Sequence, residues 1–317
     1  MPLAGKRPVV VIAGPTGVGK TALAVAVAQP LNAEIVSADS RQIYRQMNIG
    51  TAKPTPNELA AVPHHLVGIV DPDQTLTLAE YQRLAYAAID DIHRRGKLAF
   101  LVGGTGQYIT AVLEGWQTPE VAPNPALRAE LEAYAAAHGA EALFERLRAL
   151  DPDSAARMDP HNVRRTIRAL EVCIETGQPF STQRKKAPPP YRVLELGLTM
   201  PRDRLYHRLD ARIDQMMADG LLDEVRALHE CGYDWRLPSM SGLGYAQLSA
   251  HLRSELTLEE AVTEIKRATR TFVRRQYTWF RRHGALRWLE SPSPDETCQI
   301  IQNWLQSLAV EPPPQES

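Results

Sequence analysis

The sequence predicts an α/β fold, in which a parallel sheet is interrupted by an all-helical insertion. Apolar strands alternate with helical segments over residues 1–117, and a wholly helical stretch then lies between two proline-rich connectors. A further apolar strand follows the second connector. We therefore expect a core made of residues 1–117 and 191–317, with a helical insertion domain at 118–190.

The first core elements form a βαβ pattern. The β-branched run at 8–13 predicts a buried parallel strand, and the alanine-rich segment 21–29 predicts a helix. Residues 33–39 predict a second strand, and residues 98–104 predict a third, which follows an amphipathic helix at 78–94. This order predicts a doubly wound parallel sheet.

Residues that typically begin or end helices predict the structure of the insertion and of the last part of the chain. Asn124 and Pro125 predict an N-cap and the first residue of a helix. Helical segments, broken at Gly139, fill the rest of the insertion. A strand at 191–200 returns the chain to the sheet, and we expect the remainder to be helical, with a disordered tail at 311–317.

The composition limits the classes of protein to which the chain can belong. The chain has 317 residues, 44% of them hydrophobic, and a formal net charge of −1. Cys173, Cys231 and Cys298 are isolated, which favours reduced thiols over a disulfide frame or a zinc site. No apolar run reaches the roughly 18 residues of a membrane span, and the segment before the first strand is too short for a signal peptide. We expect a cytoplasmic monomer with no membrane partner.

A glycine-rich turn follows the first strand in the segment VVVIAGPTGVGKT, residues 9–21. It fits the pattern G-x-x-x-x-G-K-[ST] between a strand and a helix, where backbone N–H groups and the helix start bind phosphate. The sequence therefore predicts a P-loop NTPase-like core of the nucleotide- and ATP-binding type. Lys20 would neutralise phosphate charge and the Thr21 hydroxyl would hold Mg²⁺. The predicted phosphate-binding residues are Gly14, Pro15, Thr16, Gly17, Val18, Gly19, Lys20 and Thr21.

The third strand lacks the acid that phosphoryl transfer from ATP usually requires. It ends in Val102-Gly103-Gly104-Thr105 and offers no second metal-holding Asp. A diphosphate can bind the same loop without hydrolysis, or leave from it. Asp39 is the only acid at this edge of the sheet, and it is either a general base, a metal-shell ligand or a helix N-cap. Thr105 is open to the same capping interpretation.

Several longer motifs together resemble the tRNA dimethylallyltransferases, the isopentenyl-tRNA transferases of the IPP transferase family. The resemblance covers nearly the whole chain in the right order. The matching segments are GPTGVGKT, SADSRQIYRQMNIGTAKP (37–54), PHHL (63–66), GGTGQY (103–108), RRTIRALEV (164–172), RIDQMMADGLLDEV (212–225) and RRQYTWFR (274–281).

The resemblance implies a reaction. A dimethylallyl group would move from dimethylallyl diphosphate to N6 of the adenosine 3′-adjacent to the anticodon of a tRNA, and diphosphate would leave. No γ-phosphate is transferred, which accounts for the missing acid. The implied catalytic residues are Asp39 as general base, with Thr105 and Arg212 on the diphosphate beside the loop and Mg²⁺. The adenine would have to be everted to reach them.

For the anticodon stem-loop of the tRNA, the resemblance points to four groups of residues and to the isolated Thr105 and Arg128. The departure is Ala246, where a basic or polar residue is common. The implied residues are Asp39, Ser40, Arg41, Gln42, Thr105, Arg128, Arg164, Arg165, Thr166, Ile167, Arg168, Ser241, Gly242, Leu243, Gly244, Tyr245, Ala246, Arg274, Arg275, Gln276, Tyr277, Thr278, Trp279, Phe280 and Arg281.

The last of these groups lies in a basic stripe at 266–282, which suits a phosphate backbone and is otherwise a solvated helix face. We expect its aromatic residues, Phe272 included, to pack in the core. The adjacent His64 and His65 are expected to be structural or to shape the substrate site, because no third metal ligand follows at zinc spacing.

Three other functions remain as alternatives. A small-molecule kinase would transfer the γ-phosphate of ATP. An enzyme that prenylates a free adenine nucleotide would need neither the helical insertion nor the basic stripe. A tRNA-binding module that uses nucleotide only as a switch would leave Asp39 unexplained.

Overall fold

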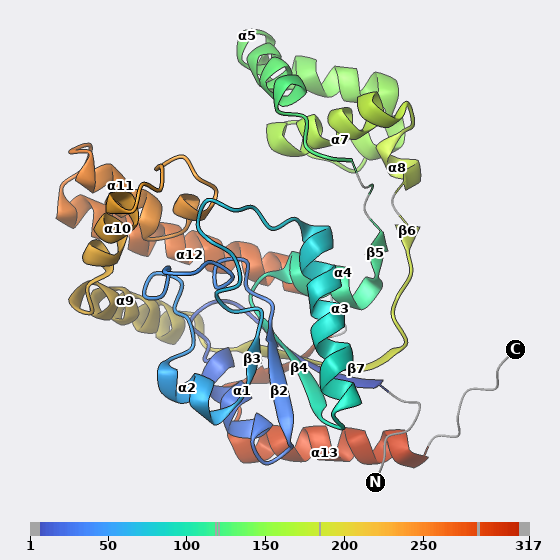
Figure 1. Cartoon of the computed structure of the whole chain (residues 1–317), viewed down its shortest axis with the longest axis vertical. Helices are drawn as coiled ribbons and strands as arrows, with labels where there is room; N and C mark the ends of the chain where they lie inside the picture. Colours follow the sequence, from blue (N-terminus) through green and yellow to red (C-terminus); the bar gives the residue numbers. More distant parts are fainter. Residues whose placement is uncertain (1–6, 118, 120, 184, 284–285, 311–317) are drawn as a thin grey trace, which may run out of the picture. The chain divides into compact units, whose positions relative to one another are not determined.

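The computed structural model describes residues 7–117, 119, 121–183, 185–283 and 286–310 (Figure 1). It divides into two compact units. The core unit comprises Met1–Leu113 and Pro189–Ser317, and the insertion unit comprises Glu114–Pro188. The tail at 311–317, for which disorder was predicted, lies outside the described residues.

Within the described residues the core unit contains a six-stranded sheet in the order β3-β2-β4-β1-β7-β8, and every ladder is parallel. The predicted parallel sheet and its four predicted strands are confirmed. The strands are β1 Arg7–Ala13, β2 Ala33–Ser37, β3 His64–His65, β4 Leu98–Gly103, β7 Tyr191–Thr199 and β8 Arg287–Glu290.

Alternate side chains of the central strand β1 pack against helices on opposite faces of the sheet. Val10 and Ile12 belong to a cluster with residues of α1 (Lys20–Ala28) and α13 (Pro294–Val310). Val9 and Val11 belong to a second cluster with residues of α3 (Leu78–Arg94) and α4 (Gly106–Glu114). Burial on both faces explains why this strand reads as a continuous apolar run.

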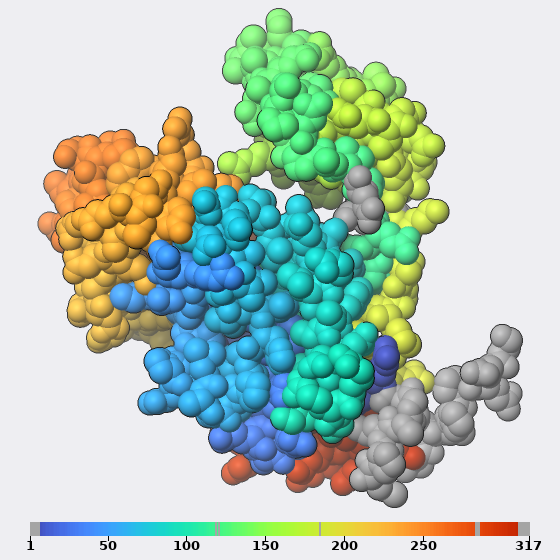
Figure 2. Space-filling view, in the orientation of Figure 1, coloured from blue at the N-terminus to red at the C-terminus, as the bar shows by residue number. Residues whose placement is uncertain are grey.

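The remaining helices of the core unit, except the short helix Pro56–Ala61, contribute to a third cluster, which contains Ile213, Leu221, Val225, Tyr245 and Ile265. In Figure 2 the orange surface of α10 and α11 lies against the blue segment near residues 41–50. The helices are α2 Pro56–Ala61, α9 Arg202–Ala218, α10 Leu221–Glu230, the 3₁₀ turn Ser239–Ser241, α11 Tyr245–Leu252 and α12 Leu258–His283.

Helix α12 holds these parts of the core unit together. Ile265 packs in the third cluster, Val273 in the first and Phe280 in the second. The helix therefore passes from the helical layer to both faces of the sheet. No helix in the described part of the chain combines the length and the apolar character needed to cross a membrane.

The expectation that the last part of the chain is entirely helical was wrong. Strand β8 pairs with β7 and places Arg287 opposite Leu196. The strand is only four residues long and lies between two long helices. A segment this short carries too little period-two pattern to be recognised in the sequence.

The insertion unit is helical apart from a two-stranded antiparallel ribbon. Asn124 caps α5, as predicted, and Gly139 interrupts this helix with a φ of 88°. The core of the unit includes Leu131, Phe144 and Leu170. Its elements are β5 Trp116–Gln117, α5 Pro125–Leu150, α6 Pro152–Ala155, α7 Val163–Thr176, α8 Phe180–Gln183 and β6 Lys185–Lys186.

A buried carboxylate joins α5 to α7 inside this unit. Glu171 is 0% exposed and accepts hydrogen bonds from Arg128 Nε and Nη2, both at 2.7 Å, from Arg168 Nη1 at 2.5 Å and from the Asn124 N–H at 2.8 Å. Burial alone would raise the pKa of Glu171. The hydrogen bonds from Arg128, Asn124 and Arg168 outweigh it and lower that pKa to about 2.

The Glu171→Gln substitution should destabilise the insertion unit by about 3 kcal/mol, because it leaves two half-buried guanidinium groups without their carboxylate. Native-state hydrogen exchange on the full chain should show faster exchange in α5 and α7. Glu175→Gln, on the same helix, is the matched control, since Glu175 makes only an exposed bond to Asn124. Equal protection in the two variants would contradict the prediction.

The same carboxylate makes the unit acid-sensitive. Its pKa is lowered on folding, so the stability that it contributes is complete above pH 4.5 and is lost as the pH falls toward 2. Protection factors in α7 of the wild type, which correct for the intrinsic pH dependence of amide exchange, should fall as the pH is lowered over this interval, and the Glu171→Gln variant should lose that part of the pH dependence.

Candidate functional site

The predicted phosphate loop connects β1 to α1 with the expected glycine geometry. Gly14 has a φ of 140°, and a Cβ at this position would lie 2.6 Å from the Leu198 carbonyl oxygen. Gly19 has a φ of 96° and immediately precedes the first residue of α1, Lys20. The loop can therefore pass close to β7 and present its N–H groups at the start of the helix.

Gln276 of α12 ties this loop to the end of β4. Its Oε1 accepts a hydrogen bond from the Thr16 N–H at 2.9 Å, and its Nε2 donates to the Gly104 carbonyl oxygen at 2.8 Å. The side chain is buried. The sequence suggested an RNA contact for Gln276, whereas here its amide joins two strand ends of the protein.

The ends of β2 and β4 are also joined by side chains. The Ser40 N–H donates to Thr105 Oγ1 at 2.9 Å, and the Thr105 hydroxyl lies 3.3 Å from Ser40 Oγ. Asp39 Oδ1 accepts from the Arg41 N–H at 2.9 Å. The residues after Asp39 form turns, so the interpretation of Asp39 as a helix N-cap was wrong.

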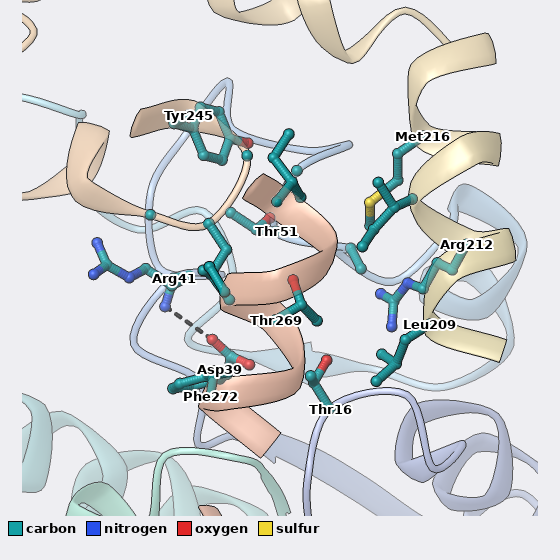
Figure 3. A pocket seen from close by; sticks show the side chains of 18 of the residues that line it. Thr16, Asp39, Arg41, Thr51, Leu209, Arg212, Met216, Tyr245, Thr269 and Phe272 are labelled. Atoms are coloured by element: carbon teal, nitrogen blue, oxygen red, sulfur yellow. Dashed lines mark hydrogen bonds between the residues drawn. The ribbon is translucent and has the colours of Figure 1, made fainter. Parts of the chain in front are cut away.

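These strand ends open into a cavity of about 610 Å³ within the core unit (Figure 3). One part of its wall is polar and includes Thr16, Lys20, Asp39, Thr105 and Arg212. Another part is apolar and is formed by α9, α12 and the first residue of α10. In Figure 3 Leu209, Arg212 and Met216 project from α9 toward the cavity, and Thr269 and Phe272 come from α12. The apolar residues are Leu209, Ile213, Met216, Leu221, Ile265 and Phe272.

The polar part of the cavity carries an excess of positive charge. Burial lowers the pKa of Lys20 to about 8; Asp39 opposes this shift and the nearby Arg212 adds to it. Burial also lowers the pKa of Arg212, with repulsion from Arg208 as the next cause and attraction to Asp39 opposing them. Cations that share one carboxylate in this way are stabilised by an added anion.

A carboxylate that sequence reasoning did not single out shapes the cavity wall. Glu224 Oε2 accepts from the N–H groups of Asn48 and Ile49, both at 2.8 Å, and Oε1 accepts from the Gly50 N–H at 3.2 Å and from Tyr245 Oη at 2.6 Å. Glu224 lies inside one matching motif, but its backbone partners at 48–50 are about 175 residues away in the sequence, which no local pattern reveals.

Arg41 makes hydrogen bonds to the segment at the rim of the cavity. Its Nη1 donates to the Pro238 carbonyl oxygen at 2.8 Å, and its Nη2 donates to Ser241 Oγ at 3.2 Å. The segment Ser241–Tyr245, which the sequence analysis also selected, lines the cavity next to these bonds.

The other residues selected for RNA contact differ in exposure. Thr166 and Ile167 are buried in the insertion unit, and Phe280 is buried in the core unit, so these side chains do not face solvent. Trp279 and Tyr277 are partly buried and pack against the core, as expected for the aromatic residues. The exposed members include Arg164, Arg165, Arg274, Arg275, Thr278 and Arg281.

Phe272 does not follow the expectation of core packing. Its side chain is 39% exposed and lines the cavity. Arg128 and Arg168, both selected for RNA contact, are about one-third exposed and pair with Glu171.

The two adjacent histidines have separate protein partners. His64 Nδ1 lies 2.7 Å from the Val62 carbonyl oxygen, and His65 Nε2 lies 2.8 Å from the buried carboxylate of Glu34. Over the part of the chain that the structure describes, no three His, Cys, Asp or Glu side chains are grouped so that they could hold a metal ion.

Comparison with known proteins identifies relatives over nearly the whole chain. The family described as IPP transferase matches residues 42–283, and the family described as Isopentenyl transferase matches residues 7–67. The chain is 58% identical to the tRNA dimethylallyltransferase of Roseiflexus castenholzii over 91% of this chain and 94% of the relative. It is 48% identical to that of Thermomicrobium roseum over 96% and 93%.

Solved structures agree with these matches. A full-length tRNA isopentenylpyrophosphate transferase from Bacillus halodurans has a TM-score of 0.71 at 41% identity, covering 96% of this chain and 97% of that one. A eukaryotic dimethylallyltransferase acting on tRNA has a TM-score of 0.79 at 27% identity, covering 98% and 81%. The P-loop NTPase-like core predicted from the sequence is confirmed.

The pKa of Lys20 predicts a pH-dependent anion site. A bound diphosphate ester favours the ammonium form, so binding above pH 8 must take up a proton. Affinity measured by calorimetry should fall as the pH rises, approaching about tenfold per pH unit above the pKa. The Lys20→Met variant should bind more weakly and lose this dependence. A wild-type affinity that is flat between neutral pH and about pH 9.5 would refute the assignment.

Proposed function

The chain belongs to the IPP transferase family, and we propose that it transfers a dimethylallyl group from dimethylallyl diphosphate to N6 of the adenosine 3′-adjacent to the anticodon in tRNA, releasing diphosphate. One observation carries the proposal at the level of the site: a single cavity is lined by Thr16 and Lys20 of the phosphate loop, by Arg212, by the carboxylate of Asp39 and by an apolar wall. Such a cavity suits a ligand that is a diphosphate at one end and a short hydrocarbon at the other.

Positive charge assists departure of the diphosphate. The allylic C–O bond breaks, and its electron pair passes to the diphosphate oxygen. Lys20, Arg212 and the N–H groups of the phosphate loop stabilise the negative charge that develops there. The hydrocarbon would lie against the apolar side chains of α9 and α12, which exclude water from the reacting carbon.

Asp39 acts as the general base. The N6 amine is a weak nucleophile, because its lone pair is delocalised into the adenine ring. As the new N–C bond forms, the Asp39 carboxylate accepts the proton that leaves N6. The hydrogen bond from the Arg41 N–H orients this carboxylate, and the bond between Ser40 and Thr105 fixes the strand ends around it.

The site contains oxygen donors of the kind that Mg²⁺ prefers. Thr21 lies in the first turn of α1, next to Lys20, and Lys20 and Asp39 both line the cavity. A hydroxyl and a carboxylate, completed by water and diphosphate oxygens, suit the octahedral oxygen coordination of this ion. Bound there, Mg²⁺ would neutralise charge on the diphosphate.

The tRNA would present an everted adenosine to this cavity, because a stacked base cannot reach Asp39. The exposed arginines of α7 and α12, including Arg165, Arg274 and Arg275, supply charge for the phosphate backbone of the anticodon stem-loop. We further propose that the protein acts as a monomer. The free cysteines support a cytoplasmic location.

A transfer assay tests the proposal against its alternatives. The protein is incubated with labelled dimethylallyl diphosphate and Mg²⁺, and with unmodified tRNA, AMP or ATP in separate reactions. Label should enter tRNA alone, and nuclease mapping should place it on the adenosine next to the anticodon. Label in AMP would favour prenylation of free nucleotides, ADP formation would favour a kinase, and binding without transfer would favour a non-catalytic module.

Replacement of Asp39 tests the general base. Asp39→Ala and Asp39→Asn should each lower turnover by roughly 10²–10⁴, since neither side chain accepts the N6 proton. Affinity for tRNA, measured by fluorescence anisotropy, should change little. Turnover near that of the wild type in either variant would remove Asp39 from the mechanism.

A further inference from the structure

Helix α9 packs directly on the phosphate loop. A Cβ on Gly17 would lie 2.6 Å from Leu209 Cδ2 and 3.2 Å from Leu205 Cδ1. Residues three and four positions apart share one face of a helix, so Leu205, Leu209 and Arg212 form one stripe. Leu205 and Leu209 of this stripe face the loop, and Arg212 faces the cavity.

Arg208 belongs to the same stripe and is one turn before Arg212. Its Nη2 and Nη1 atoms lie 3.7 and 3.8 Å from the position that a Cβ on Gly19 would occupy. Gly19 precedes Lys20 at the start of α1. The Arg208 guanidinium is therefore beside the phosphate loop, on its solvent-exposed side.

Among the described residues, no carboxylate lies within 4.0 Å of the Arg208 guanidinium. Arg270 of α12, by contrast, pairs with Asp210 of α9. Arg208 also repels the charge of Arg212, and this repulsion contributes to the lowered pKa of Arg212. Packing of the protein does not explain why the Arg208 cation lies beside Lys20, Arg212 and the anion-binding loop. A bound anion would be attracted to all three cations.

We propose that Arg208 is a second diphosphate-binding arginine, which contacts the departing diphosphate from the solvent side while Lys20 and Arg212 contact it within the cavity. The assignment rests on the proposed function. The guanidinium fork donates N–H groups to diphosphate oxygens and forms no covalent bond. Its contribution grows as the C–O bond breaks and its electron pair moves onto the diphosphate.

Calorimetry with inorganic diphosphate and with dimethylallyl diphosphate tests this assignment without any need for turnover. Arg208→Ala should weaken binding of both by about tenfold to a hundredfold, the range for a hydrogen bond to a charged group. Arg208→Lys should recover part of the affinity. The matched control is Arg202→Ala on the same helix, because Arg202 lies over the Tyr206 ring, about 9 Å along α9 from Arg208.

Kinetics separate diphosphate binding from a general structural role. Arg208→Ala should lower kcat and raise KM for dimethylallyl diphosphate while leaving KM for tRNA near the wild-type value. Added guanidinium ion should restore part of the activity of Arg208→Ala but not change Arg202→Ala. A fold defect would instead alter both KM values and resist rescue.

The outcomes distinguish this inference from the proposed function. If the wild type binds both diphosphates and Arg208→Ala binds them equally well, the inference is wrong and the proposed function is unaffected. If the wild type binds them and Arg208→Ala does not, yet no prenyl group reaches tRNA, the proposed function fails and the anion site stands. If the wild type binds neither compound, both are wrong.

Discussion

The site depends on one buried side-chain amide. Gln276 accepts from the loop that follows β1 and donates to the strand end of β4, and it projects from a helix whose other residues pack on both faces of the sheet. Loop, strand end and helix are thereby fixed to one another by two hydrogen bonds. Because a buried amide must keep both partners to avoid a desolvation cost, displacement of any one of these three parts is opposed by the others.

The cavity built on this frame separates two kinds of surface. Cations gather where the strands end, and hydrocarbon side chains gather along α9 and α12. Their proximity explains the lowered pKa of Lys20, since the surroundings that exclude water from an apolar ligand also remove it from the ammonium group. Binding of an anionic ligand group therefore offsets the desolvation cost that the apolar surroundings impose on the Lys20 ammonium group.

Sequence reasoning was strongest where the signal is local. The glycine loop and the buried strands could be predicted because backbone conformation and β-branched runs are written in consecutive residues, and the quoted motifs gave Asp39, Thr105 and Arg212, which the structure brings to one cavity. Strand β8 was too short to recognise. The bonds of Glu224 to the backbone at 48–50 and the bridging role of Gln276 join residues more than 170 positions apart, so no local pattern could assign them.

The pairing of Arg128 and Arg168 with Glu171 has a consequence for surface chemistry in the insertion unit. A guanidinium carries five N–H donors, and a carboxylate occupies only some of them. Arg168 Nη2 donates in addition to the Val121 carbonyl oxygen at 3.1 Å. The internal carboxylate therefore restrains two side chains that are otherwise flexible, and a restrained arginine loses less rotational freedom on meeting an anion than a free one.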